Sequence, residues 1–154
     1  MVGETVDLRS ELPVVARHEG VWEGRFVEID TDLSVVDRFE TRISVDLSPD
    51  GEWSYRQRNR YRWPDGTEAT HDLPGTYEDG RIVFDTDYVQ GEAWEATHDD
   101  RSVVLTWTRP EEPSVSYHEI ITINAADDSR ARTWHWFDED GLMKRTLIEE
   151  ERVE

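Results

Sequence analysis

The sequence contains no cysteine, which excludes disulfide bonds, thiolate metal ligands and catalytic thiols. No apolar run approaches the roughly 18 residues that a membrane span requires. The N-terminus, MVGETVDLRSELP, lacks the basic segment followed by an apolar one that marks a secretory signal. We therefore expect a cytoplasmic protein with no membrane segment.

Basic residues are also scarce: 17 Lys and Arg stand against 36 Asp and Glu, for a formal net charge of −19. Nucleic acids and anionic membranes are bound through Lys/Arg-rich surfaces, so neither is an expected partner. The negative charge is expected to serve solubility. An acidic surface for a protein partner is the alternative.

The composition favours a folded chain in spite of its polarity. A charged fraction of 34% and a mean hydropathy of −0.79 resemble values of disordered chains. Seven Trp, five Tyr and four Phe argue against disorder, because disordered chains are poor in aromatics. A length of 154 residues fits one domain that can bury a sizeable core, so we expect residues 1–154 to form a single domain.

Hydrophobic and aromatic residues recur with a period of two along most of the chain, which predicts β-strands. The predicted strands are 21–29, 35–47, 53–63, 81–89, 92–98, 102–109, 114–124, 130–137 and 142–150. Turn sequences separate them, several with the Asp-Gly pair typical of hairpins, at 48–52, 63–67, 77–81, 98–102, 124–129 and 138–142.

Only the segment 7–17 has helical spacing, through Leu8, Leu12 and Val15, and Pro13 limits it to a short helix. About nine or ten antiparallel strands would expose two edges and an apolar face in an open sheet. Closure removes the edges. We therefore predict an all-β, up-and-down barrel of about 8–10 strands over residues 20–150, with the helix plugging one end. A two-sheet sandwich is the alternative.

The stretch WSYRQRNRYRW, residues 53–63, shows the two registers of one such strand. Four arginines alternate on one register and should face water, paired with carboxylates of neighbouring strands such as Glu68 and Asp72. A phosphate or carboxylate site is the alternative. These arginines are Arg56, Arg58, Arg60 and Arg62.

The other register should face the barrel interior. It places two amides, Gln57 and Asn59, between aromatic residues. A buried amide without a partner costs roughly 1–3 kcal/mol, so these amides either bond to each other and to other polar groups or line a wet cavity. The predicted ligand-binding residues of this strand are Trp53, Tyr55, Gln57, Asn59 and Tyr61.

Further polar candidates lie on other predicted strands: His71, Tyr117, Glu119 and His135. Both registers of 114–124 and of 130–137 carry apolar groups, so the sequence does not decide which register faces inward. Trp134 and Trp136 are candidates for the cavity wall. If the protein is an enzyme, His135 or Glu119 would act as the base, and Tyr61, Tyr117 or Asn59 would donate to an oxyanion.

The segment HEGVWEGRF, residues 18–26, resembles the Gly-X-Trp element of the lipocalin and wider calycin barrels. The resemblance implies that Trp22 closes one end of the barrel under an arginine of the last strand. Arg145 is the first candidate for that arginine, and Arg152 is the second. An arginine over an indole face gains about 0.5–2 kcal/mol by cation–π attraction.

The longer patterns HEGVWEG, NRYRWPDG, LTWTR and RTWHWFDEDGL are similar to an uncharacterised bacterial lipocalin-like family, over nearly the whole chain. That resemblance implies a calycin barrel and brings no established activity. The stretch Gly20–Gly24 also resembles nitrobindin-type barrels, which would imply haem bound through His135. Arg25 and Phe26 depart from the glycine-rich continuation of those proteins.

We expect the barrel to bind a small, largely apolar molecule, aromatic or isoprenoid-like, in its lumen. The alternatives are a cofactor-independent enzyme with isomerase, cyclase or lyase chemistry, a haem protein, and a filled barrel without a ligand. The scattered histidines and the lack of nucleophile or phosphate-loop motifs predict neither a metal site nor a cofactor. A homodimer is left open.

Overall fold

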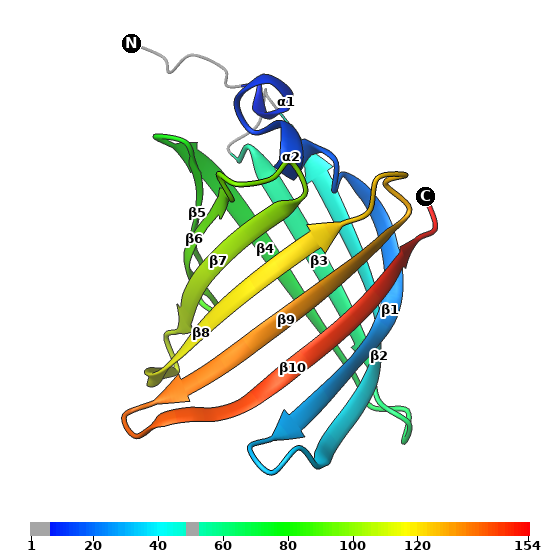
Figure 1. The fold of residues 1–154 in the computed structure, drawn as a ribbon, viewed down its shortest axis with the longest axis vertical. Coiled ribbons are helices and arrows are strands. Elements are labelled where there is room, and N and C mark those ends of the chain that lie inside the picture. The colour runs from blue at the N-terminus through cyan, green and yellow to red at the C-terminus, as the bar shows by residue number, and fades with distance from the viewer. Residues whose placement is uncertain (1–6, 49–52) are drawn as a thin grey trace.

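Ten antiparallel strands form a closed barrel in the computed structural model, which describes residues 7–48 and 53–154 (Figure 1). The strands are β1 Gly20–Asp30, β2 Val35–Leu47, β3 Tyr55–Arg62, β4 Glu68–Glu78, β5 Arg81–Asp85, β6 Gln90–Glu95, β7 Ser102–Arg109, β8 Glu112–Ile123, β9 Ser129–Asp138 and β10 Gly141–Arg152. Each strand pairs with its neighbours in sequence, and β1 also pairs with β10. The predicted up-and-down barrel is confirmed, and the sandwich alternative is wrong.

Closure occurs between the first and last strands, where Phe26 of β1 lies between Ile148 of β10 and Phe39 of β2. All three side chains are buried. Inward and outward residues alternate along the strands, as in β3, where every second residue is buried. The predicted turn at 48–52 lies almost wholly outside the described residues.

Strand β4 has no counterpart among the predicted strand ranges, although we treated Glu68, His71 and Asp72 as strand residues. It contains Pro74, which cannot donate to a ladder and argues against a strand in sequence reasoning. In the structure Pro74 lies opposite Arg56 of β3, next to Gly75. Gly75 is buried, and a Cβ there would come within 2.5 Å of the Ile82 side chain. Pro74 and Gly75, which argue against a strand in the sequence, therefore lie within β4, and Gly75 packs closely against Ile82 of β5.

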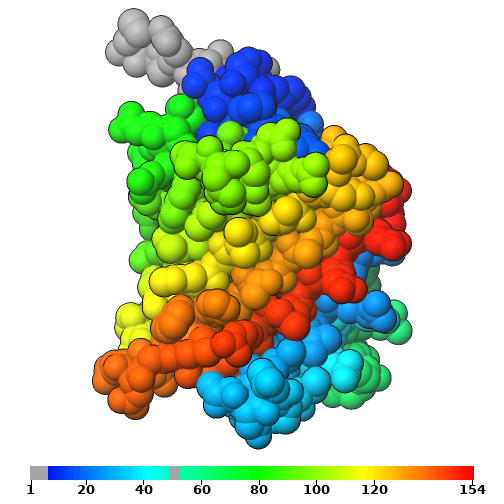
Figure 2. Space-filling model, in the orientation of Figure 1, coloured from blue at the N-terminus to red at the C-terminus, as the bar shows by residue number. Residues whose placement is uncertain are grey.

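Two short helical turns, α1 Leu8–Glu11 and α2 Pro13–Ala16, cap one end of the barrel (Figures 1 and 2). The Asp7 side chain caps α1 by accepting a hydrogen bond from the Arg9 amide. We predicted a single helix over 7–17. It is interrupted at Leu12, whose φ and ψ of −132° and 71° are not helical, because the residue before a proline avoids the α region.

The plug is fixed by both apolar and polar contacts. Leu8, Leu12, Val14 and Val15 are buried in the core. The backbone amides of Val14 and Val15 both donate to Glu95 Oε2, at 2.6 and 2.9 Å. The opposite end of the barrel, formed by the β1–β2, β3–β4, β5–β6, β7–β8 and β9–β10 connections, has no helix among the described residues. We call this end the mouth.

The outer face of β3 carries the predicted arginine–carboxylate pairs. Arg56 donates to both oxygens of Asp72, at 2.8 and 2.6 Å, and Arg60 donates to Glu68 at 2.9 Å. Pairs this exposed contribute up to about 1 kcal/mol each. Among the described residues, no helix is long and apolar enough to cross a membrane.

Candidate functional site

The structure decides the registers that the sequence left open. Of the candidate residues, those with side chains in the barrel interior are Tyr55, Gln57, Asn59, Tyr61, Tyr117, Glu119, Trp134 and Trp136. They come from the neighbouring strands β8 and β9 and from β3, which is paired with neither, so the closure of the barrel brings them together.

Two other candidates, His135 and Trp53, lie elsewhere, whereas His71 lies on the inward register of β4, opposite Asn59. His135 faces outward, opposite His118 of β8, because Trp134 and Trp136 occupy the inward register of β9. Its predicted roles as interior base and as haem ligand are therefore wrong. His71 is half-buried and stacks on Tyr88 with ring centroids 3.8 Å apart. Trp53 is half-buried before the start of β3, with the Arg56 guanidinium 5.6 Å from its ring.

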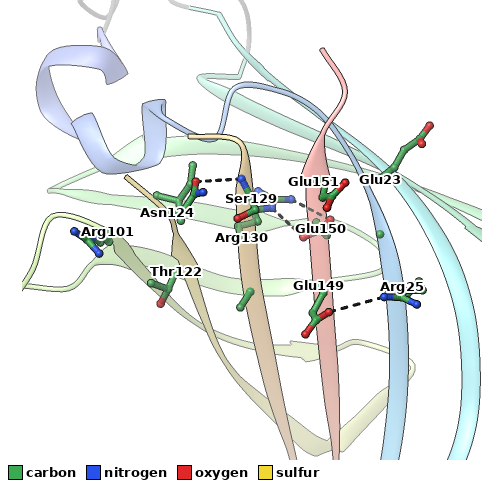
Figure 3. Close-up of a pocket in the computed structure, with 13 residues that line it drawn as sticks. Glu23, Arg25, Arg101, Thr122, Asn124, Ser129, Arg130, Glu149, Glu150 and Glu151 are labelled. Atoms are coloured by element: carbon green, nitrogen blue, oxygen red, sulfur yellow. Dashed lines mark hydrogen bonds and ion pairs between the residues drawn. The ribbon is translucent and has the colours of Figure 1, made fainter. Parts of the chain in front are cut away.

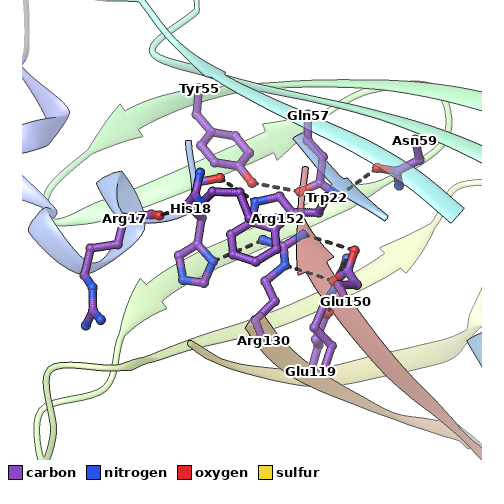
Figure 4. Close-up of polar contacts among 11 residues, drawn as sticks. Arg17, His18, Trp22, Tyr55, Gln57, Asn59, Glu119, Arg130, Glu150 and Arg152 are labelled. Carbon is purple, nitrogen blue, oxygen red and sulfur yellow. Dashed lines mark hydrogen bonds and ion pairs between the residues drawn. The ribbon is translucent and has the colours of Figure 1, made fainter. Parts of the chain in front are cut away.

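The two amides of β3 belong to a hydrogen-bonded row along the inner face of the strand (Figure 4). Tyr55 donates its hydroxyl to Gln57 at 2.8 Å, Gln57 donates to Asn59 at 2.9 Å, and Asn59 donates to the Tyr61 hydroxyl at 2.9 Å. The amides therefore satisfy each other and also line the interior cavity.

A network of buried charges crosses the interior next to this row (Figure 4). Arg130 donates to Glu150 at 2.9 Å, and Arg132 donates to Glu119 at 2.7 Å and to Glu150 at 3.4 Å. Arg130 also lies 3.1 Å from Nδ1 of His18. All four charged side chains are at most 3% exposed. Opposite charges thus compensate each other inside the barrel, as buried ions require.

The network sets the charge states of its members. Burial alone would raise the pKa of Glu150, but Arg130 and Arg132 outweigh it and hold the pKa below its usual value. Burial lowers the pKa of Arg132, but Glu119 and Glu150 raise it further than burial lowers it. Burial, reinforced by Arg130, holds the pKa of His18 well below its usual value, so His18 is neutral at pH 7.

Two arginines cover Trp22 at the end of the barrel that α1 and α2 close. The guanidinium of Arg152 lies 4.4 Å from the Trp22 ring and that of Arg130 lies 4.5 Å from it. Arg152 was our second candidate. Arg145, the first, is wrong, because it lies opposite Ile29 near the far end of β1. Trp22 itself is fully buried and donates its indole N–H to the His18 carbonyl at 3.0 Å.

The other end of the lumen, toward the mouth, holds Arg109, which sequence reasoning did not single out. Its guanidinium lies 4.8–5.5 Å from the centroids of four aromatic rings. These are Tyr88, Trp107, Tyr117 and Trp136, and with Arg109 they form what we call the aromatic cage. Trp107 and Tyr117 stack with centroids 3.9 Å apart, and Trp134 meets Trp107 edge-on at 5.1 Å.

A small cavity of about 40 Å³ lies in the lumen between the cage and the buried charges. Its walls include Gln57 and Asn59 of the amide row, Glu119 and Arg132 of the charge network, and Trp107, Arg109 and Trp134 at the mouth side. This volume has room for about one water molecule, so most of the lumen is filled by side chains.

Several polar groups of the aromatic cage and the cavity wall have no hydrogen-bond partner among the described residues. They include Nε of Arg109, the hydroxyl of Tyr117 and Nε1 of Trp134. By contrast, Nε1 of the neighbouring Trp136 donates to Thr146 at 2.8 Å. All three unpaired groups can donate a hydrogen bond, and two of them, on arginine and tryptophan, cannot accept one. The site therefore lacks acceptors.

The titratable groups of the site are suited to hydrogen bonding. Burial raises the pKa of Tyr117 to about 12, although Arg109 opposes the shift. Burial likewise raises the pKa of Tyr61. Both hydroxyls therefore keep their protons at pH 7. Burial and Arg109 lower the pKa of His71, which is therefore mainly neutral. The interior can hold and orient a hydrogen-bond acceptor.

A surface hollow of about 610 Å³ lies outside the barrel, across β8, β9, β10 and β1 (Figure 3). Small side chains such as Ala131 and Thr122 line it, flanked by Glu149 and Arg25, which lie 4.0 Å apart. Within the described part of the chain, no three His, Asp or Glu side chains are grouped to hold a metal ion. The interior is the stronger candidate, since it combines burial with unpaired donors.

Residues 9–154 match the family described as domain of unknown function DUF3598, N-terminal. The chain belongs to the DUF3598 family. A DUF3598 protein of unknown function from Nostoc punctiforme has a similar structure, with a TM-score of 0.66 and 21% identity over 90% of this chain. This chain covers 49% of the Nostoc protein and so spans about half its length. No curated protein matches the chain.

Two other solved structures have the same barrel. The S-type phycobiliprotein lyase CPES from Guillardia theta gives a TM-score of 0.68 at 16% identity and covers 90% of both chains. Rv2717c from M. tuberculosis gives a TM-score of 0.66 at 13% identity, and the match covers 96% of this chain and 100% of the Rv2717c chain. At these identities the likeness concerns the fold.

Proposed function

We propose that the barrel binds a small, largely apolar molecule, aromatic or isoprenoid-like, in its lumen, and that this molecule enters through the mouth. The observation that supports the proposal most directly is the aromatic cage. Four aromatic rings surround one guanidinium that has no ion-pair partner among the described residues. A flat apolar group inserted among the same rings would stack on them and be removed from water.

Binding requires Arg109 to move, because the present cavity of about 40 Å³ is too small for such a molecule. Arg109 is well placed to do so. It sits at the end of β7, next to the β7–β8 connection, is half-buried, and forms no side-chain hydrogen bond with the described residues. Tyr88 and His71 beside it are also half-buried. Turning Arg109 outward would leave its space among the rings to the ligand.

Barrels of this type include a phycobiliprotein lyase, which is consistent with a lumen that receives a small molecule. Two of the three alternatives, the haem protein and the acid–base enzyme, lose their main residue, whereas the filled barrel without a ligand stays an alternative that the binding experiment tests. Haem binding and the acid–base enzyme both relied on His135, which faces outward. Glu119, the second predicted base, is held by Arg132 at 2.7 Å. We therefore propose binding as the function.

Quenching of tryptophan fluorescence tests the proposal, because Trp107, Trp134 and Trp136 all lie beside the lumen. Retinol and retinoic acid are suitable isoprenoid probes. We expect saturable quenching by at least one of them, with the probe recovered chemically unchanged. A Trp107→Ala variant should lose affinity, whereas Trp94→Ala, on the outer register of β6, should not. Absence of saturable quenching by both probes would contradict the proposal.

A further inference from the structure

We infer that the ligand of the lumen carries a carboxylate and that Arg109 binds this group. The inference rests on the proposed function and adds the chemical class of the ligand. It follows from the juxtaposition of an unpaired guanidinium with unpaired buried donors at one end of an aromatic-walled lumen.

Arg109 is unusual among the arginines of this acidic chain. Arg56, Arg60 and Arg132, for example, each bind a carboxylate. In the described ranges 7–48 and 53–154, Arg109 has no such partner, and its Nε is buried without an acceptor. Arg38, Arg62, Arg145 and Arg152 also lack a carboxylate there. Arg38 and Arg62 are exposed to water, Arg152 donates to backbone carbonyls, and Arg145 has no buried unpaired nitrogen. A buried donor without a partner is costly, and an arriving anion would remove that cost.

Carboxylates near the mouth do not fill this role. Glu28 is engaged by Lys144, whose Nζ lies 3.1 Å from it. Glu112 is opposite Arg109 in the β7–β8 ladder, and Glu111 lies in the same connection, but both are exposed and neither forms an ion pair with Arg109. The described residues therefore offer Arg109 no carboxylate.

The deeper donors point to the same chemistry. Tyr117, a member of the cage, is fully buried, and Trp134 is 6% exposed; both rings pack against Trp107 of the cage. Their O–H and N–H groups have no acceptor among the described residues. A ligand rich in acceptors would satisfy them, whereas an alcohol, amine or hydrocarbon offers fewer acceptors or none. A carboxylate offers two oxygens, which match the paired N–H groups of a guanidinium.

A matched pair of small ligands tests the inference by isothermal titration calorimetry. The acid is 2-naphthoic acid and the neutral analogue is 2-naphthalenemethanol, which share one flat skeleton. We expect the acid to bind about 10- to 100-fold more tightly, the range for hydrogen bonds to a charged group. Retinoic acid and retinol form a second pair with an isoprenoid skeleton and should show the same order.

Variants assign the preference to Arg109. Arg109→Gln should abolish the preference for the acid over the alcohol, and Arg109→Lys should retain part of it. The matched control is Arg62→Gln, which makes the same change at the mouth end of β3 but on the exposed face. Circular dichroism before each titration confirms that a variant is folded.

The outcomes separate the two proposals. If acids and neutral analogues bind equally well, the lumen is a binding site and the inference of a carboxylate is overturned. The same holds if the preference persists in Arg109→Gln or disappears in Arg62→Gln. If no member of either pair binds the wild-type protein, the proposed function is contradicted and the inference falls with it.

Discussion

Glu150 is the residue that joins the two buried arginines of β9. Its carboxylate accepts hydrogen bonds from both Arg130 and Arg132, and its side chain is fully shielded from water. Removing one partner of a buried charge pair is far more damaging than removing a surface partner, because the remaining charge is left without compensation. The barrel therefore depends on this carboxylate more than on the many carboxylates at its surface.

A Glu150→Gln variant should lower the free energy of unfolding by about 3–5 kcal/mol, measured by urea denaturation. The control is Glu68→Gln, which removes the exposed partner of Arg60 and should cost about 1 kcal/mol or less. A Glu150→Gln variant as stable as the control would show that the buried network does not stabilise the fold.

His18 makes stability depend on pH. Burial and the nearby Arg130, Arg132, Arg17 and Arg152 lower its pKa in the folded protein, so the unfolded chain binds the proton more readily. The stabilising effect of neutral His18 is complete above its unfolded pKa of about 6.5 and is lost as the pH falls below that value. His71, whose pKa is also lowered, acts in the same direction.

We therefore expect the free energy of unfolding to decrease between pH 6.5 and pH 5. The slope contributed by His18 is at most about 1.4 kcal/mol per pH unit. Urea denaturation at pH 7, 6 and 5 measures it. A His18→Gln variant keeps an acceptor for Arg130 and should show a shallower slope over the same range. Identical slopes in the two proteins would mean that His18 is not the group responsible.

At the scale of the strands, the contact between β1 and β10 closes the barrel, and Gly24 lies within this contact. It is opposite Glu150 in the register. A Cβ at Gly24 would lie 2.1 Å from the Glu149 carbonyl oxygen and 2.7 Å from Cγ of Glu150. Backbone atoms cannot yield as a flexible side chain can, so the absence of a side chain lets the first and last strands approach.

A Gly24→Ala variant should therefore lower the free energy of unfolding by about 1–3 kcal/mol or more, the usual cost of overpacking. Gly66→Ala in the β3–β4 turn is the comparison, because nothing lies within 4 Å of its Cβ position. The only penalty for the Gly66→Ala variant is the positive φ of 89° at this residue, which costs an alanine about 1–2 kcal/mol. Thermal unfolding followed by circular dichroism compares them, and a Gly24→Ala midpoint above that of Gly66→Ala would contradict this account.

The sequence of a strand predicted which of its side chains face the barrel interior only where charged and apolar residues alternate clearly. In β3 the aromatic and amide register contrasts with the arginine register, so Gln57 and Asn59 could be placed inward from sequence. In β9 arginine and tryptophan share one register, as Arg130, Arg132 and Trp134 show. Charged residues normally face water, and their carboxylate partners come from β8 and β10, so only the closed barrel shows that they are buried.

At the scale of the whole molecule, the barrel has two different ends. One end is closed by α1 and α2 above the covered Trp22, and the other is the mouth, with Arg109 inside its rim. The period of two and the Asp-Gly turns were sufficient to predict the closed meander. Tyr117 and Trp136 of the cage were among the predicted residues. Arg109 was not, because it becomes notable only through rings that come from its own strand, two other strands and a connection.

The central claim is that a small molecule enters the lumen at the mouth, and the indole N–H signals of a ¹⁵N-labelled protein test it most directly. Titration with retinoic acid should shift the signals of Trp107, Trp134 and Trp136, assigned by single Trp→Phe variants. The signals of Trp22 under the plug and Trp94 on the outer face should stay in place. Shifts confined to Trp22 or Trp94, or no shifts at all, would contradict the claim.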